Sequence, residues 1–160
     1  MPITLIAGGG MAGRACALTL RRVGYQGEIV LVGDETTPPY DRPPLSKSVI
    51  VGTADLEKVV KPGPEAYAED GVDLRLGTTV ASVDGAARTA TLSDGSTVAW
   101  DTLVLATGCA PRSAPIAGLE RAHRVTRMDE ALAIQAILAE GPKDRKSTRL
   151  NSSHEWISRM

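Results

Sequence analysis

The sequence predicts an α/β fold in which a parallel sheet carries an antiparallel β-meander as an insertion. Two short apolar segments, residues 3–7 and 28–32, flank a segment with apolar residues at helical intervals, as in a strand, helix, strand unit. Shorter segments in the middle of the chain alternate apolar and polar residues between Asp-Gly pairs, which is typical of antiparallel hairpins. We therefore expect two kinds of sheet in one chain.

The composition excludes several classes of protein. The chain has 160 residues, of which 42% are hydrophobic and 23% charged, and its formal net charge is -1. This fits an ordinary domain, although the chain is too short for an enzyme that holds two nucleotides. There is no basic excess for nucleic acid and no apolar run long enough to cross a bilayer. Cys16 and Cys109 have neither disulfide nor metal-ligand spacing. We expect a cytoplasmic protein with no metal site, no nucleic acid partner and no membrane association.

The first predicted strand ends in a glycine-rich turn with G-x-G-x-x-G spacing. Gly8 would allow the tight turn, Gly10 would let the backbone approach a pyrophosphate, and Gly13 would let the helix pack closely on the strand. Met11 and Ala12 would begin that helix, which we expect to end at Gly24. The N–H groups and partial positive charge of a helix amino terminus favour phosphates.

A carboxylate follows the second predicted strand, about 20 residues after the glycine turn. There, Asp34 could accept hydrogen bonds from the two ribose hydroxyls of an adenosine. The alternative is a glycine turn with a structural role alone. The order of strand, helix, second strand and carboxylate favours dinucleotide binding, but the motif by itself does not choose between FAD and NAD.

A proline-rich segment, Pro39 to Lys47, reads PYDRPPLSK. Its two adjacent prolines, Pro43 and Pro44, would give a stiff and largely extended loop beside the nucleotide. Such a loop would direct Arg42 and Lys47 toward a pyrophosphate or toward the electron-rich end of a reduced flavin. The alternative is that both are solvated surface cations.

The remaining predicted elements complete the sheet and lead away from it. Further strands are expected over residues 72–76, 80–83, 89–92, 97–100 and 103–106, and a helix over 129–138 before Gly141-Pro142. The strand 103–106 ends in Thr107-Gly108, where a doubly wound sheet would bring its carboxyl edge to a cofactor. The alternative for this glycine is an ordinary turn after a core strand.

Five segments of the chain together resemble one flavoprotein family. They read GGGMAG, VGDE, PYDRPPLSK, DTLVLATGCAPR and RVTRMDEAL, and they are spread through residues 1–143. In them the chain is similar to the FAD-dependent reductases of the ferredoxin reductase type, within the pyridine nucleotide-disulfide oxidoreductase superfamily. This resemblance implies a Rossmann-like FAD-binding βαβ sheet. The mitochondrial apoptosis-inducing flavoproteins share much of the pattern.

The resemblance also implies a reaction and a set of site residues. FAD would take a hydride from NAD(P)H and pass single electrons to a 2Fe-2S ferredoxin. Lys47 would be the catalytic residue, near the isoalloxazine, whereas Arg127 could equally be a surface charge. Disulfide reductases of this superfamily carry a cysteine pair after the second strand, and residues 46–60 contain no cysteine. The implied FAD contacts are Gly8, Gly10, Met11, Ala12, Gly13, Asp34, Arg42, Lys47, Val80, Ala106, Thr107, Gly108 and Arg127.

The expected organisation has three parts. Residues 1–112 would form the first part of an FAD-binding domain, and residues 113–143 would cross toward an NAD(P)-binding domain that this truncated sequence lacks. Residues 144–160 begin DRKSTRLNSSH, which reads as a translated sequencing adaptor and is expected to be non-native. The fragment would be inactive by itself. Two alternatives stay open: another flavoprotein, such as a rubredoxin reductase or an apoptosis-inducing-factor-like protein, and a non-catalytic nucleotide-binding fragment.

Overall fold

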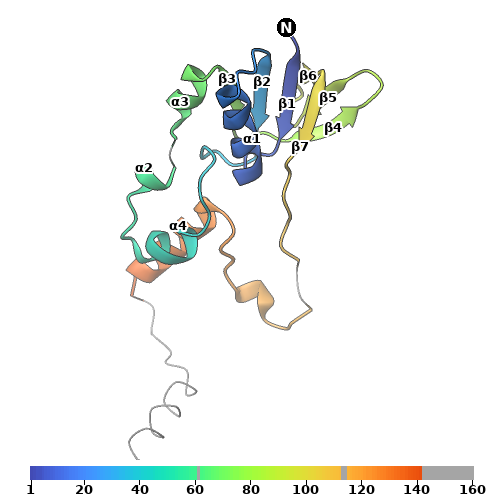
Figure 1. The fold of residues 1–160 in the computed structure, drawn as a ribbon. Helices are drawn as coiled ribbons and strands as arrows, with labels where there is room; N and C mark the ends of the chain where they lie inside the picture. The colour runs from blue at the N-terminus through green and yellow to red at the C-terminus, as the bar shows by residue number, and fades with distance from the viewer. Residues whose placement is uncertain (61, 113–114, 142–160) are drawn as a thin grey trace, which may run out of the picture.

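A four-stranded parallel sheet lies at the top of the molecule in the view of Figure 1. The computed structural model describes residues 1–60, 62–112 and 115–141, so the expected adaptor segment 144–160 lies outside the described residues. The strand order is β3-β2-β1-β7, and Leu5 of β1 lies opposite Val30 of β2 and Leu103 of β7. The strands are β1 (Ile3–Ala7), β2 (Glu28–Val32), β3 (Val72–Arg75) and β7 (Thr102–Leu105).

Helix α1 (Met11–Arg22) packs on one face of this sheet. Ile6, Ile29 and Leu31 point to that face, where they meet Ala17 of α1 and Tyr67 in a buried cluster. Each of these five residues is at most 1% exposed. The crossover from β1 to β2 therefore buries a continuous apolar layer, which fixes where α1 begins relative to the ends of the strands.

The antiparallel meander covers the opposite face of the parallel sheet. It consists of β4 (Val80–Asp84), β5 (Thr89–Leu92) and β6 (Thr97–Ala99), in the order β4-β5-β6. Ala90, Leu92 and Val98 pack against Leu5 and Val30 of the parallel sheet. The fold class that the sequence predicts, a parallel Rossmann-like sheet with a meander insertion, is therefore confirmed.

A small helical unit lies beside the sheet, where distant parts of the chain meet (Figure 1). Tyr40, Leu45 and Val49 pack there against Met128 and Ala131 in a third buried cluster. The sequence predicts only one of its elements, α4 (Met128–Ala139). The sequence does not predict the unit's π-helix η1 (Leu45–Val49) or its α2 (Leu56–Val59). Outside the unit it also misses the 3-10 helix η2 (Leu119–Arg121) and α3 (Pro64–Glu69), whose Tyr67 packs on the sheet with α1.

The proline-rich segment differs from the expected extended loop. Leu45 N donates to Arg42 O at 3.0 Å, so the chain turns at Pro43 and Pro44, and Pro44 already has helical backbone angles. Burial of Leu45 and Val49 against α4 favours this helical turn over an extended chain. No helix of the described residues is long and apolar enough to cross a membrane.

Candidate nucleotide-binding site

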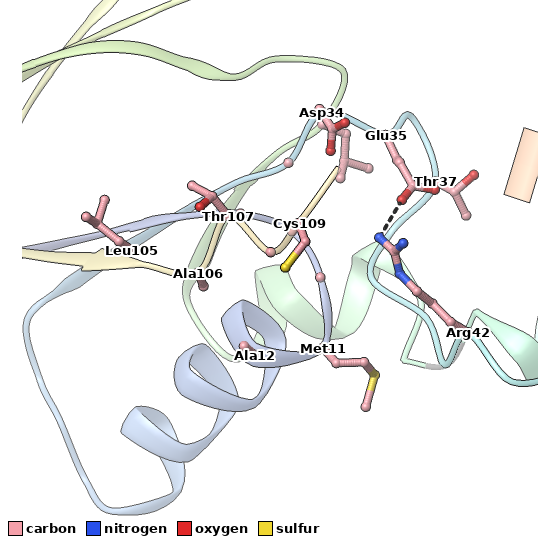
Figure 2. A pocket seen from close by; sticks show the side chains of 16 residues that line it. Met11, Ala12, Asp34, Glu35, Thr37, Arg42, Leu105, Ala106, Thr107 and Cys109 are labelled. Atoms are coloured by element: carbon pink, nitrogen blue, oxygen red, sulfur yellow. Dashed lines mark hydrogen bonds and ion pairs between the residues drawn. The ribbon is translucent and has the colours of Figure 1, made fainter. Parts of the chain in front are cut away.

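A cavity of about 550 Å³ opens at the carboxyl ends of β1, β2 and β7, beside the first turn of α1 (Figure 2). Loops that follow parallel strands meet at this edge, and doubly wound folds bind their ligands there. The residues that line the cavity are Gly8, Gly9, Gly10, Met11, Ala12, Gly33, Asp34, Glu35, Thr37, Arg42, Leu76, Leu105, Ala106, Thr107, Gly108 and Cys109.

Two glycines of the turn after β1 are required by the packing of the protein itself. Gly8 has a φ of +121°, and a Cβ atom on it would lie 2.1 Å from Ala106 O. A Cβ atom on Gly13 would lie 2.0 Å from Gly8 O, which is impossible without moving α1. The structure thus confirms the close packing of helix on strand, and it shows that β7 also depends on Gly8.

Gly10 is different, because no protein atom explains why it lacks a side chain. It lies at the N-cap of α1 with a φ of -83°, and a Cβ atom on it would meet nothing within 4 Å. No side chain caps the helix, and its first turn has no acidic residue. The N–H groups of the first turn thus lack helix partners beside the cavity, which suits a bound anion such as a phosphate.

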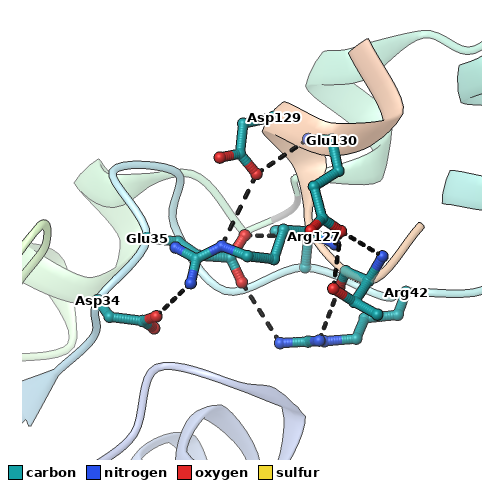
Figure 3. Close-up of polar contacts among 8 residues, drawn as sticks. Asp34, Glu35, Arg42, Arg127, Asp129 and Glu130 are labelled. Atoms are coloured by element: carbon teal, nitrogen blue, oxygen red, sulfur yellow. Dashed lines mark hydrogen bonds and ion pairs between the residues drawn. The ribbon is translucent and has the colours of Figure 1, made fainter. Parts of the chain in front are cut away.

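Asp34 lies on the other side of the cavity, where it pairs with an arginine from the far end of the chain (Figure 3). Arg127 Nη1 donates to Asp34 Oδ2, and Arg127 is the N-cap residue of α4. The hydrogen bond with Asp34 raises the pKa of the Arg127 guanidinium. The Asp34 side chain is 51% exposed, so its carboxylate is still accessible from the cavity.

Glu35 forms a second charged group next to Asp34. Its Oε1 accepts from Arg42 Nη2 at 3.3 Å, and its Oε2 accepts from the Tyr40 hydroxyl at 2.6 Å. Burial, followed by the hydrogen bond to Glu35, raises the pKa of Tyr40. The other terminal nitrogen of Arg42 donates to Thr126 O at 2.7 Å. Arg42 therefore joins the loop after β2 to the segment that leads into α4.

Glu130 fixes the start of α4. Its Oε2 accepts from Thr126 N and from Thr126 Oγ1, both at 2.7 Å, and from Arg127 N at 3.2 Å. These hydrogen bonds, that of the Thr126 hydroxyl foremost, lower the pKa of Glu130. The carboxylate therefore orients both residues that pair with the loop after β2, Thr126 through its carbonyl and Arg127 through its side chain.

The structure brings most of the expected site residues together, but not all of them. Gly13 lies on the buried side of α1 itself, and Arg127 reaches the cavity through Asp34. Val80 lines a neighbouring hollow of about 210 Å³ that shares three residues with the main cavity. Lys47 lies exposed in η1, outside the residues that line the cavity. The expected site residues that line the main cavity are Gly8, Gly10, Met11, Ala12, Asp34, Arg42, Ala106, Thr107 and Gly108.

Sequence reasoning missed several residues of the cavity. Gly9 and Gly33 approach each other so closely that a Cβ atom on Gly9 would lie 2.9 Å from Gly33 Cα. Glycines at the ends of two adjacent parallel strands are the signal that could have shown this contact. No local pattern indicates Glu35, because its partners become apparent only after the chain has folded. The other residues missed are Thr37, Leu76, Leu105 and Cys109.

The cysteines and the potential metal ligands were located in the part of the chain that the structure describes. Cys16 and Cys109 are free thiols, half-buried and exposed respectively. No group of three or more His, Cys, Asp or Glu side chains could hold a metal ion among these residues. The cavity instead combines a helix amino terminus with carboxylates and guanidinium groups, which suits the phosphates and ribose of a nucleotide.

The chain is similar to several known reductases. The chain is 40% identical to the ferredoxin–NAD(+) reductase component of a p-cumate 2,3-dioxygenase system from Pseudomonas putida, over 86% of this chain and 34% of that protein. It is 34% identical to rhodocoxin reductase from Rhodococcus erythropolis, over 84% and 32% of the two chains. A solved complex of putidaredoxin reductase with putidaredoxin matches with a TM-score of 0.79 and 37% identity, over 86% of this chain and 34% of that one.

The extent of the matches and the family of the chain are also defined. The chain spans about a third of the length of the curated relatives it matches. The model of the pyridine nucleotide-disulphide oxidoreductase family matches residues 3–148, which include the glycine turn, the loop after β2 and α4. The chain therefore belongs to the pyridine nucleotide-disulphide oxidoreductase family.

Proposed function

We propose that this chain binds FAD, and that the whole protein passes electrons from NAD(P)H to a 2Fe-2S ferredoxin. The relatives named above are reductases of ferredoxin-type proteins, which supports this reaction. When bound, FAD would supply the redox chemistry, by accepting a hydride and releasing single electrons. Because the chain spans about a third of its relatives, we infer that residues beyond this sequence bind the nicotinamide and that the chain alone is inactive.

Each side of the cavity would bind a different part of FAD. The first turn of α1, with Gly10, Met11 and Ala12, would donate N–H groups to the diphosphate. Asp34 would accept hydrogen bonds from the ribose, and Arg42 would add positive charge near the phosphates.

The other residues in the proposed FAD site depend more on the family resemblance. The segment 106–108 would let its backbone approach the flavin, since Gly108 has a φ of +67° and a Cβ atom on it would meet nothing within 4 Å. Val80 would contact FAD from the neighbouring hollow. Arg127 would exchange part of its pairing with Asp34 for contact with FAD. Lys47, three residues after Pro44, is proposed near the isoalloxazine on the resemblance alone.

The single observation that carries the proposal is the open space beside Gly10. The protein leaves room for a side chain at this position, at the uncapped start of a helix that faces the cavity. A ligand that needs this space explains the glycine, and the anion preference of a helix amino terminus explains why the ligand carries phosphate.

The free thiols also favour our further proposal that the protein is cytoplasmic.

The test compares two glycines that both have open space for a side chain, one beside the cavity and one away from it. Gly10→Ala is expected to raise the dissociation constant of FAD about tenfold, because a methyl group would enter the space of the diphosphate. Gly85→Ala, in a turn of the meander, is the matched control, since a Cβ atom there also meets nothing within 4 Å. Both variants should unfold at the same denaturant concentration as the unchanged chain.

The measurement is a fluorescence titration of each variant with FAD, first in the protein that continues beyond this sequence and then in this chain. A colourless protein that takes up no added FAD would overturn the proposal. So would a Gly10→Ala variant whose FAD affinity equals that of Gly85→Ala.

A further inference from the structure

Glu35 is an acidic residue on the wall of a cavity that suits phosphates, which calls for a physical explanation. Its side chain is only 16% exposed, and each of its carboxylate oxygens has a donor of its own. Its backbone is also fixed, because Gly77 N donates to Glu35 O at 3.0 Å. Glu35 therefore has little freedom to turn toward a ligand.

The first donor, Tyr40, is rigidly placed. It is 4% exposed and packs against Leu45, Val49 and Met128 in the cluster that joins η1 to α4. Its hydroxyl lies 2.6 Å from Glu35 Oε2. Burial of the aromatic ring thus fixes one oxygen of the carboxylate and leaves the other oxygen pointing to Arg42.

The second donor, Arg42, is a long side chain that would otherwise sample many rotamers. Glu35 holds its Nη2 at 3.3 Å and Thr126 O holds its Nη1 at 2.7 Å, so each terminal nitrogen has a protein partner. The Arg42 side chain is nevertheless 50% exposed and lines the cavity (Figure 2). A cation held this way loses less entropy when an anion binds.

We propose that Glu35 is a positioning residue, which through its ion pair with Arg42 presents the guanidinium to a diphosphate group in the cavity. This inference rests on the proposed function, because FAD is the source of the diphosphate. In this proposal Glu35 acts through Arg42 and not by contact with the ligand, because its side chain is only 16% exposed and each of its oxygens holds a donor. Its action depends on Arg42, and that dependence can be measured.

The experiment is a double-mutant cycle in the protein that continues beyond this sequence, with FAD, ADP and adenosine as ligands. Glu35→Gln keeps the shape of the side chain but loses the charge that pairs with Arg42. We expect it to raise the dissociation constants of FAD and ADP about tenfold. The constant for adenosine, which has no phosphate, should stay unchanged.

Two further variants separate positioning from folding. In an Arg42→Ala background, Glu35→Gln should cause no additional loss, because the residue through which it acts is gone. Asp41→Asn, in the same loop as Arg42, is the control, since Asp41 pairs with Arg14 of α1 at 3.2 Å and lies outside the residues that line the cavity. Its FAD affinity should equal that of the unchanged protein.

Should Glu35→Gln itself fail to fold, Tyr40→Phe removes only one hydroxyl that fixes the carboxylate and should weaken FAD and ADP about threefold. Three results would overturn the inference. One is a loss of adenosine affinity as large as that of FAD, and another is an undiminished effect of Glu35→Gln in the Arg42→Ala background. The third is unchanged FAD affinity in both Glu35→Gln and Tyr40→Phe. These results differ from failure of the proposed function, in which the unchanged protein itself would not bind FAD, and both proposals would fall.

Discussion

The two sides of the cavity are built by different kinds of interaction. One side, which we term the glycine wall, consists of Gly8 and Gly9 and is shaped by backbone atoms in close contact. The other side, which we term the charged cluster, consists of Asp34, Glu35, Arg42 and Arg127 and is shaped by ion pairs between side chains. The glycine wall tolerates no added atom at Gly8, whereas the half-exposed Asp34 of the charged cluster stays open to further hydrogen bonds.

This difference shows how one cavity can be stable and still bind a nucleotide. Close backbone packing contributes to the stability of the sheet itself, because the turn also touches the end of β7. Partly exposed ion pairs contribute little to stability, typically below about 1 kcal/mol, so a nucleotide can replace the pair of Asp34 with Arg127 at small cost. Substitutions in the glycine wall should therefore affect folding, and substitutions in the charged cluster should affect binding.

The largest expected effect follows from Gly8→Ala. The φ of +121° and a Cβ atom 2.1 Å from Ala106 O should lower the free energy of unfolding by about 3 kcal/mol or more. Urea denaturation, monitored by circular dichroism, measures this free energy. Gly85→Ala, which adds the same methyl group in open space, should change this free energy by less than about 0.5 kcal/mol. Equal denaturation midpoints for the two variants would show that the turn is not shaped by packing.

A smaller effect, on binding rather than folding, is expected for Asp34→Asn. Loss of the charge should raise the dissociation constant of FAD about tenfold, because the ribose hydroxyls lose a charged acceptor. The free energy of unfolding should change by less than about 1 kcal/mol, since the pair with Arg127 is partly exposed. A titration with FAD and a urea curve on the same preparation give both values.

Asp73→Asn provides a closely matched control for Asp34→Asn. Asp73 is 52% exposed and pairs with Arg75, which is 36% exposed, whereas Asp34 is 51% exposed and its partner Arg127 is 36% exposed. Asp73 lies away from the residues that line the main cavity. Its substitution should leave FAD affinity unchanged, and an equal loss of affinity in both variants would mean that the charged cluster has no special role.

The smallest expected effect concerns pH and the start of α4. The folded pKa of Glu130 is lowered, so the stability it contributes is present above its ordinary pKa and is lost as the pH falls through the lowered value. Melting temperatures measured from neutral to acid pH should thus fall less steeply for Glu130→Gln than for the unchanged chain. Parallel curves for the two proteins would show that Glu130 stabilises α4 without its charge.

Local patterns in the sequence predicted the central strands and the glycine turn closely. The structure confirms the strands at residues 3–7, 28–32 and 89–92 with the expected bounds. The last parallel strand begins and ends one residue earlier than expected, at Thr102–Leu105, although Ala106 N still donates to Ala7 O at 2.8 Å. These elements are predictable because alternation, apolar runs and glycine sterics act between near neighbours.

The helical unit and the charged cluster could not be predicted in this way. Leu45 and Val49 fold into a π-helix because α4, about 80 residues later, offers them an apolar surface. Lys47 consequently lies outside the residues that line the cavity, where the sequence alone suggested a loop beside the nucleotide.

The sequence by itself determined the α/β class, the glycine turn and the carboxylate after β2, because each depends on short-range sterics and on the periodicity of apolar residues. Only the tertiary structure decided that Arg127 pairs with Asp34 and that Thr126 holds Arg42. These contacts join residues 93 and 84 positions apart. Such pairs form only after burial has docked α4 beside η1, so no local pattern records them.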